Sequence, residues 1–339
     1  MKDGDHILIE NCAGLGDVVM FTPALRKIKE LYPNCTIGFI TKPINKPLLE
    51  RLPYVDRQYF VARGKFLGRV RPAAHLLGQD YVIFTRWQPQ LAFLTYLCRI
   101  PHRIGLYQEK YAKTNLFHKT FKDWVLDTPI FAAKTIAETL AYALECELSI
   151  TDWQCDVSRA NAAEKQKMEE LLRGLGMPSG QKFVVLAPFT SREERDLPAQ
   201  LLKAVEDFIS KKLGRACVIV GTKEYTASVS KQAGIYNLCG QTNLFELNAL
   251  LEDADFVVAA DSGPMHMACA LQKKTVAVFS KDIPERWAPQ KYCYPVTLHM
   301  HCSPCGDEVA EVCPTRECIK GITPAMVIAQ IEKLLAEKD

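Results

Sequence analysis

Short apolar runs alternate with amphipathic stretches along almost the whole chain. Each run is rich in β-branched and aromatic residues and is bounded by turn residues, which is typical of buried strands. Strands that alternate with helices in this way indicate an α/β protein built on parallel sheets. The predicted strands cover 6–10, 36–40, 57–61 and 81–85 in the first half, and 182–187, 216–221, 236–240, 255–260 and 275–280 in the second.

The second half also shows the helices between its strands. Amphipathic spacing predicts helices over about 198–213, 223–233, 244–252 and 264–271, and a last helix over 323–337 that starts at a Thr-Pro pair. A polar, charge-mixed stretch over 150–180 ends in Gly-Met-Pro-Ser-Gly and suits a connection between domains. We therefore expect two Rossmann-like domains, residues 1–155 and 156–339, whose parallel sheets face a cleft.

Chemistry is expected in the loops that follow the strands, because ligands of open parallel sheets bind beyond the carboxyl ends of the strands. After the first strand, Gly14 and Gly16 permit a tight turn with positive φ and a close approach of the backbone to a ligand. A dinucleotide-binding fingerprint would need a third glycine where Val19 stands. A hydride-transfer enzyme is therefore disfavoured.

Asp17 follows these glycines at the start of a helix that Pro23 kinks or restarts, with Thr22 as a candidate cap. An acid at this position caps a helix N-terminus and complements the helix dipole. The same carboxylate would serve as a general base towards an acceptor hydroxyl. The position alone leaves both roles open.

The second half carries a candidate anion site after the strand that ends at residue 260. Ser262 and Gly263 open a helix and Pro264 suits its first turn, so the backbone N–H groups there are apt for a pyrophosphate. Asp261 would fix this loop or contact a sugar hydroxyl. His266 is either a hydrogen-bonded helix residue or a second contact to phosphate or sugar.

Two more loops are expected at the same edge of the second sheet. Glu224, after the strand 216–221, would accept hydrogen bonds from a ribose diol. Three loops at adjacent strand ends favour a binding site over separately solvated side chains. The loop 187–198 supplies four side chains able to bind phosphate oxygens, Thr190, Ser191, Arg192 and Arg195.

Composition fits an ordinary globular protein, with 48% hydrophobic and 24% charged residues, and excludes disordered and fibrous classes. The chain starts directly with a strand rather than a secretory signal, and no apolar stretch is long enough to span a bilayer, so we expect a cytoplasmic protein. Between Arg57 and Lys122, twelve basic residues stand against two acids, while the rest of the chain is net acidic. This basic stretch is either a solvated face or a surface for an anionic acceptor or membrane headgroups.

Thirteen cysteines in a chain of this kind argue for reduced thiols. Four of them form a C-x2-C-x7-C-x4-C cluster whose first pair has the spacing of a zinc knuckle: Cys302, Cys305, Cys313 and Cys318. Four thiolates suit a tetrahedral zinc or a single iron, with two disulfides or free thiols as the alternatives. A closed four-sulfur site has no open position, so such a metal would be structural.

Several segments together resemble the family 9 glycosyltransferases, the heptosyltransferases of lipopolysaccharide assembly. They are GLGDVV with TPAL, then Arg195 followed by Leu197 and Pro198, then ADSGPMHMACAL and TVAVFS. The resemblance covers nearly the whole chain in order. It implies a GT-B fold, an ADP-sugar donor on the second domain, an acceptor on the first, and inversion without a catalytic metal.

The resemblance also assigns roles by position. Asp17 matches the family's proposed base, and Arg195 stands where the family usually has a lysine that contacts the donor phosphates. Leu197 replaces the usual tryptophan. The implied contacts to the donor's sugar, pyrophosphate, ribose and adenine come from Asp261, Ser262–Met265, Glu224 and Thr242, with His266 beside them. For the acceptor we expect contacts from Gly14, Gly16, Arg86 and Trp87.

The resulting hypothesis is a single displacement that moves heptose from ADP-heptose to a hydroxyl of an anionic glycan such as lipopolysaccharide core. The expected partners are this donor, a glycan or lipid-linked acceptor and the cytoplasmic face of the inner membrane, and no nucleic acid. One alternative is a protein heptosyltransferase of the autotransporter type. Some of these enzymes carry an iron-binding cysteine finger, which the cysteine cluster of this chain resembles. The others are a GT-B enzyme or epimerase for another nucleotide sugar, and a non-catalytic nucleotide-binding module.

Overall fold

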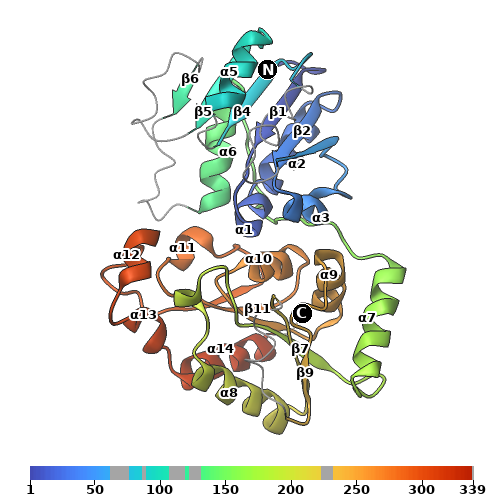
Figure 1. Cartoon of the computed structure of the whole chain (residues 1–339), viewed down its shortest axis with the longest axis vertical. Helices are drawn as coiled ribbons and strands as arrows, with labels where there is room; N and C mark the ends of the chain where they lie inside the picture. The colour runs from blue at the N-terminus through green and yellow to red at the C-terminus, as the bar shows by residue number, and fades with distance from the viewer. Residues whose placement is uncertain (62–75, 86–88, 107–118, 122–130, 223–231, 338–339) are drawn as a thin grey trace. The chain divides into compact units, whose positions relative to one another are not determined.

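The computed structural model describes residues 1–61, 76–85, 89–106, 119–121, 131–222 and 232–337 (Figure 1). The chain divides into two compact units, Met1–Val157 and Ser158–Asp339, called unit 1 and unit 2 below. The division falls two residues after the boundary expected from the sequence.

The described part of unit 1 contains one sheet of six parallel strands in the order β3-β2-β1-β4-β5-β6. The four strands predicted from the apolar runs lie where they were expected, and two further strands extend the sheet. The strands are β1 (His6–Glu10), β2 (Thr36–Thr41), β3 (Arg57–Phe60), β4 (Tyr81–Phe84), β5 (His102–Leu106) and β6 (Lys119–Phe121).

Helices connect these strands and cover the sheet. Those described are α1 (Leu15–Val19), α2 (Thr22–Leu31), η1 (Pro43–Asn45), α3 (Lys46–Leu49), α5 (Pro89–Leu97) and α6 (Ala132–Ala143). The helix α2 is amphipathic and buries Ala24, Leu25 and Ile28, which is the i, i+1, i+4 face that a sheet-covering helix presents. It packs against α6.

The described part of unit 2 repeats the same topology. Its six parallel strands lie in the order β12-β11-β10-β7-β8-β9, which matches unit 1 when the strands are counted from the start of each unit. Both units thus have the Rossmann arrangement, in which the strand order reverses between β1 and β4 and between β7 and β10. The strands are β7 (Phe183–Ala187), β8 (Ala216–Ile219), β9 (Ile235–Asn237), β10 (Val257–Ala260), β11 (Thr275–Val278) and β12 (Cys293–Val296).

Helices lie on both faces of the second sheet, with α8 and α14 on one side and α9 and α10 on the other (Figure 1). The last helix buries Val327, Ile331 and Leu334 in the same core as the sheet, so it belongs to unit 2. The described helices are α7 (Ala162–Gly174), η4 (Glu193–Arg195), α8 (Ala199–Asp207), the π-helical η5 (Phe208–Lys212), α9 (Leu244–Asp253), α10 (Gly263–Ala270), α11 (Pro284–Trp287), α12 (Asp307–Val312), α13 (Glu317–Lys320) and α14 (Pro324–Ala336).

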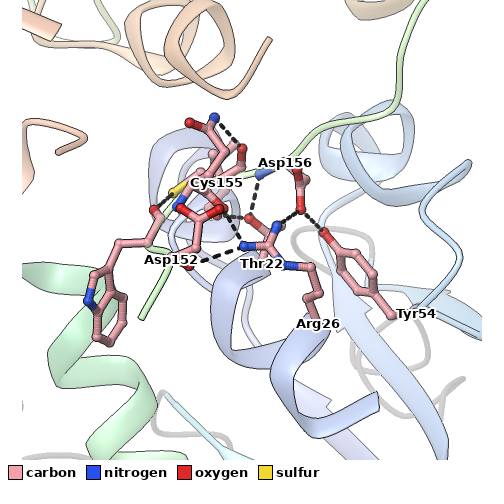
Figure 2. Close-up of polar contacts among 9 residues, drawn as sticks. Thr22, Arg26, Tyr54, Asp152, Cys155 and Asp156 are labelled. Atoms are coloured by element: carbon pink, nitrogen blue, oxygen red, sulfur yellow. Dashed lines mark hydrogen bonds and ion pairs between the residues drawn. The ribbon is translucent and has the colours of Figure 1, made fainter. Parts of the chain in front are cut away.

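The end of unit 1 is held to α2 by a polar cluster (Figure 2). The carboxylate of Asp156 pairs with Arg26 and accepts a hydrogen bond from the Tyr54 hydroxyl (2.9 Å), while the Asp156 N–H donates to Thr22 Oγ1 (2.8 Å). The Arg26 guanidinium also donates to the carbonyl of Gln154 at 2.9 Å. Burial, with the negative charge of Asp156, raises the pKa of Tyr54 well above its usual range, so the hydroxyl stays a donor.

The start of unit 2 is held just as closely. Asn248 Nδ2 donates to the Ser158 carbonyl at 2.7 Å, and the Ala160 N–H donates to Glu252 Oε1 at 3.1 Å. The connection between the units is therefore much shorter than the stretch 150–180 that the composition suggested, because α7 within that stretch packs on α9 of unit 2.

Within the described ranges, no helix is both long and apolar enough to cross a membrane.

Candidate functional site

The loop after β1 uses its own side chains to bind its own backbone. Three successive N–H groups each donate to a nearby side-chain oxygen: Cys12 to Glu10 Oε1 (3.2 Å), Ala13 to Asn11 Oδ1 (3.0 Å) and Gly14 to Asp17 Oδ2 (3.0 Å). A glycine loop that cradles phosphate offers such N–H groups to its ligand instead. This loop is therefore not built to hold a phosphate, in keeping with the missing dinucleotide fingerprint.

The expectation that Gly14 and Gly16 adopt positive φ is wrong. Gly14 has φ −75° and ψ 173°, which any residue adopts, and Gly16 lies inside α1 and is not among the positive-φ glycines of the described chain. A Cβ at Gly14 would lie 3.1 Å from Asp17 Oδ2. A side chain at this position would therefore press against the carboxylate of Asp17 and make it shift by a few tenths of an ångström.

Asp17 lies in the first turn of α1, where its carboxylate accepts the Gly14 N–H. The helix-cap interpretation is thus correct as geometry. This hydrogen bond uses only part of the accepting capacity of the Asp17 carboxylate, because an ionised carboxyl group has about four acceptor positions. As expected, the chain restarts as α2 with Pro23 in its first turn, but Thr22 does not cap that helix, since its hydroxyl donates to the Val19 carbonyl at 2.7 Å.

In unit 2, α10 begins directly beyond the carboxyl end of β10, at the point where the strand order reverses. Ser262 occupies the N-cap position, yet within the described structure its side chain makes no cap hydrogen bond and its hydroxyl donates back to the Ala260 carbonyl at 3.1 Å. Gly263 and Pro264 form the first turn, and the Met265 side chain is fully buried, so only its backbone can meet a ligand. This helix start retains the character of an anion site.

Arg195 lies beside this helix start, in η4 after β7. Its Nη1 is 3.8 Å from Asp261 Oδ2 and its Nη2 donates to Ser191 Oγ at 3.4 Å. Both side chains of the ion pair are largely buried, and Arg195 Nε has no hydrogen-bond partner among the described residues. Three side chains from the loops after β7 and β10, expected at one edge from the sequence, are thus adjacent in the structure.

Thr190 shapes this loop from within. Its N–H donates to Asp196 Oδ1 at 2.6 Å, and its hydroxyl accepts the N–H of Arg192 at 3.0 Å. Arg192 itself points towards Glu194, with Nη1 4.0 Å from Oε1. Of the two arginines of the loop, Arg195 is therefore the one paired with Asp261.

His266 is buried within α10 and its Nδ1 lacks a hydrogen-bond partner in the described part of the chain. The interpretation as a hydrogen-bonded helix histidine is therefore not supported for this nitrogen. Burial lowers the pKa of His266 to about 4, so the ring is neutral at pH 7. It would offer a phosphate or sugar a neutral hydrogen-bonding group rather than a positive charge.

The remaining expected contacts are only partly described. Thr242 is half-buried in the loop between β9 and α9, two strands along the edge from β7. Glu224, Arg86 and Trp87 lie outside the described residues.

The four clustered cysteines lie around two short helices at the end of unit 2. Cys302 and Cys305 precede α12, Cys313 follows it and Cys318 is in α13. Burial raises the pKa of Cys318, with smaller contributions from the other three thiols. Within the described residues, however, no three or more His, Cys, Asp or Glu side chains are gathered closely enough to hold a metal ion.

This cysteine segment is attached to the loop after β11. The Cys305 N–H donates to the Lys281 carbonyl (3.1 Å), Lys281 Nζ lies 3.5 Å from the Cys305 carbonyl, and Ser303 Oγ is 3.4 Å from the Ser280 carbonyl. Lys281 is a buried cation at the same edge of the sheet as Asp261, and sequence reasoning did not single it out. The signal available for it was its place just after a predicted strand.

Comparison with known proteins gives a consistent result. A family model described as glycosyltransferase family 9 (heptosyltransferase) matches residues 70–315. The chain is 27% identical to lipooligosaccharide heptosyltransferase 2 of Haemophilus influenzae over 300 residues, covering 84% of this chain and 86% of that protein. It is 24% identical to lipopolysaccharide heptosyltransferase 2 of Salmonella typhimurium over 370 residues, covering 98% and 99%.

Solved structures share the fold. A family 9 glycosyl transferase from Veillonella parvula superposes with a TM-score of 0.84 at 18% identity, covering 100% of this chain and 99% of that one. E. coli ADP-heptose lps heptosyltransferase II superposes with a TM-score of 0.73 at 21% identity, covering 99% of this chain and 98% of that one. The iron-containing dodecameric glycosyltransferase TibC of E. coli superposes with a TM-score of 0.62 at 16% identity, covering 99% of this chain and 77% of that one. These likenesses confirm the GT-B fold expected from the sequence.

Proposed function

The chain belongs to glycosyltransferase family 9, and from this premise we propose that it transfers heptose from ADP-heptose to a hydroxyl of lipopolysaccharide core, with inversion at the anomeric carbon. The observation that carries the proposal is the pairing of Arg195 with Asp261 beside the start of α10. The relatives that align with most of the chain are lipopolysaccharide and lipooligosaccharide heptosyltransferases. The name of one structural neighbour includes ADP-heptose.

In this proposal unit 2 binds the donor. The N–H groups that start α10 and the guanidinium of Arg195 bind the diphosphate, and they stabilise the negative charge that grows on ADP as the glycosidic bond breaks. Asp261, held near Arg195 at 3.8 Å, accepts hydrogen bonds from the sugar. These groups supply the leaving-group stabilisation without a catalytic metal.

Unit 1 provides the base. Asp17 removes the proton from the acceptor hydroxyl as that oxygen attacks the anomeric carbon, and the Gly14 N–H holds the carboxylate at 3.0 Å. General-base catalysis of this kind contributes roughly 10²–10⁴-fold in rate. The excess of basic residues between 57 and 122 suits an anionic acceptor, with Arg86 and Trp87 as its proposed contacts.

The first experiment is calorimetric titration of the purified protein with ADP, GDP, UDP and ADP-heptose. We expect selective binding of the adenine nucleotides and a loss of about tenfold or more in ADP affinity for Arg195→Ala, because charge-assisted contacts to phosphate are strong. Arg192→Ala, from the same loop, should weaken ADP less, since its guanidinium lies towards Glu194. A preference for UDP, or no nucleotide binding, would overturn the donor assignment.

The second experiment measures heptose transfer by Asp17→Asn. The amide keeps the shape of the side chain but cannot take a proton, so transfer should fall by about 10²–10⁴ while ADP affinity is kept. Full transfer activity in this variant would leave Asp17 only as a helix cap.

The proposal includes peripheral contact with the cytoplasmic face of the inner membrane. Helix α5 exposes three large apolar side chains, Phe93, Tyr96 and Leu97. Arg103 stacks its guanidinium 5.5 Å from the centre of the Tyr96 ring, which adds a positive charge to the same face. An exposed apolar helix face with basic neighbours fits an anionic lipid surface.

Vesicle co-sedimentation tests this contact. Binding to anionic but not neutral vesicles should drop in a Phe93→Ser, Leu97→Ser variant. The control is Val309→Ser, Val312→Ser, which removes two even more exposed apolar side chains from unit 2. Equal binding by both variants would remove α5 as the contact surface.

The proposal also includes a structural zinc or iron held by Cys302, Cys305, Cys313 and Cys318. Support comes from the donor chemistry of four thiols in a C-x2-C-x7-C-x4-C spacing and from a structural neighbour described as iron-containing. Elemental analysis of protein purified without metal-affinity resin should give about one equivalent per chain, lost in Cys302→Ser and kept in Cys98→Ser. Well under one equivalent in the unaltered protein would refute it.

A further inference from the structure

Asn45 is a fully buried amide in unit 1, at the end of η1. Its Nδ2 donates to the Ala13 carbonyl at 3.4 Å and to Thr41 Oγ1 at 2.7 Å. The two hydrogens of one side chain thus join the last residue of β2 to the loop after β1. Around them, α1 packs against η1 and α3.

The orientation of this amide follows from its partners. The Ala13 carbonyl can only accept a hydrogen bond, so the nitrogen of Asn45 must face it and the oxygen must point away. Asn45 Oδ1 is then buried with no donor among the described residues. An unpaired buried acceptor is costly, and this cost offsets part of what the two donated hydrogen bonds contribute to stability. The net gain in stability from an asparagine here is therefore reduced.

The bond to Ala13 reaches Asp17 through a single peptide group. The carbonyl of Ala13 and the N–H of Gly14 belong to the same planar unit, so fixing the oxygen also fixes the direction of the N–H. That N–H donates to Asp17 Oδ2 at 3.0 Å. Asn45 and Asp17 therefore bind the two ends of one rigid peptide.

We propose that Asn45 is a positioning residue for the carboxylate of Asp17, acting through the Ala13–Gly14 peptide. The inference rests on the proposed function, in which Asp17 is the base. Without the Asn45 donor this peptide can rotate, and the Asp17 carboxylate loses its set distance to the acceptor hydroxyl. Misplacement of a reacting group by about 1 Å can cost 10²-fold in rate.

The direct test is Asn45→Leu, which fills a similar volume without polar atoms. We expect kcat for heptose transfer to fall about ten- to a hundredfold, with the donor KM and the ADP Kd unchanged, because the donor site lies in unit 2. The unfolding midpoint should fall, because the Ala13 carbonyl and the Thr41 hydroxyl lose their donor, so kcat is expressed per ADP-binding site to keep this loss of stability out of the comparison. Thr41→Val, which keeps the bond to Ala13, should lose less than threefold in kcat.

Where Asn45→Leu fails to fold, Asn45→Ala serves the same comparison, since the fraction of protein that binds ADP reports how much is folded. A kcat per ADP-binding site equal to that of the unaltered protein would overturn the proposal.

A double-mutant cycle with Asp17→Asn distinguishes this inference from the proposed function. If Asn45 acts through Asp17, its substitution should have no further effect on kcat once Asp17 is an amide. The matched control is Asn248→Ala in unit 2, another buried asparagine whose Nδ2 donates to a backbone carbonyl and whose Oδ1 has no described partner. The effect of Asn248→Ala on kcat should simply add to the effect of Asp17→Asn.

Additive losses from Asn45 and Asp17 would overturn the positioning role and leave the base assignment intact. Full activity of Asp17→Asn would instead overturn the base itself.

Discussion

A glycine next to a helix start is usually explained by backbone freedom, but Gly14 has a φ of −75° that any residue adopts. Its missing side chain leaves room for a carboxylate instead, since a Cβ there would lie 3.1 Å from Asp17 Oδ2. The sequence predicted a functional glycine at this position for the wrong reason. The backbone torsion angles of a glycine and the side chains that approach it depend on how the chain folds. The sequence alone does not contain this information.

Gly14→Ala should therefore lower kcat for heptose transfer about tenfold, because the new methyl group displaces the carboxylate that would act as the base. Gly174→Ala is the matched control: it also has negative φ, and its added Cβ would meet no atom within 4 Å. That control should keep full kcat and gain up to about 1 kcal/mol in the free energy of unfolding. Unchanged kcat in Gly14→Ala would contradict the close approach.

His266 carries a pH dependence of folding. Its pKa is lowered by burial to about 4 in the folded chain, against about 6.5 in an unfolded one. Between these values the unfolded chain binds a proton that the folded chain does not, so stability falls as the pH drops from 6.5 towards 4. We expect a contribution of about 2 kcal/mol to the loss between pH 7 and pH 5. Urea unfolding at both pH values measures this loss of stability, and it should be about 2 kcal/mol smaller in His266→Gln than in the unaltered protein. An equal loss in the two proteins would contradict the role of His266.

Among elements, the helix starts of unit 2 differ in how they are capped. Helix α9 begins with a full capping box, in which Asn243 Oδ1 accepts the Glu246 N–H and the Glu246 carboxylate accepts the Asn243 N–H. Helix α7 has the same arrangement with Asn161 and Glu164. At α10, by contrast, Ser262 turns its hydroxyl to the Ala260 carbonyl. The helix start assigned to the donor is left without the side chain that would compete for its N–H groups.

This difference predicts opposite effects of two substitutions. Asn243→Ala should cost about 1 kcal/mol in the free energy of unfolding and leave ADP affinity unchanged. Ser262→Asp should raise stability by about 0.5–1 kcal/mol by capping α10, yet weaken ADP binding by tenfold or more, because the new carboxylate repels the diphosphate. Chemical unfolding and calorimetry on the two variants check this. Tighter ADP binding by Ser262→Asp would be incompatible with a diphosphate at α10.

The strands that the sequence did not predict lie at or near the sheet margins. The strand β12 contains Pro295, which cannot donate to a neighbouring strand and is tolerated at a sheet edge, so its sequence does not resemble an interior strand. The strand β5 starts with His102 and Arg103, and β6 has only three residues. Interior strands were predictable because both of their faces are buried and their sequences are continuously apolar.

At the scale of the whole molecule, one topology occurs twice, and each copy has its own core. The topology also explains why the residues after β7 and β10 could be predicted to meet, since both strands flank the reversal of strand order. Asn45 could not be predicted in this way, because its proposed role depends on a hydrogen bond to another loop. The described residues that we propose for the donor, with Arg195 and Asp261 among them, all belong to unit 2.

Calorimetric unfolding should therefore resolve two transitions, of which ADP stabilises only one. At an ADP concentration 100 times its Kd, that transition should gain about 2.7 kcal/mol. Arg195→Ala should reduce the gain in the same transition, and Asp17→Asn should not. A single transition that shifts as a whole would show that the units unfold together, and an equal shift of two transitions would contradict a donor site confined to unit 2.

The short connection between the units has a consequence for how such enzymes diversify. The described anchors of residues 152–156 lie in unit 1, at Thr22, Arg26 and Tyr54, and those of residues 158–160 lie in unit 2, at Asn248 and Glu252. A genetic crossover at Val157 would thus separate no pair of these bonded residues. Recombination at this codon would join the proposed donor half to a different first half, and each half would keep these described hydrogen bonds, and unit 1 its ion pair.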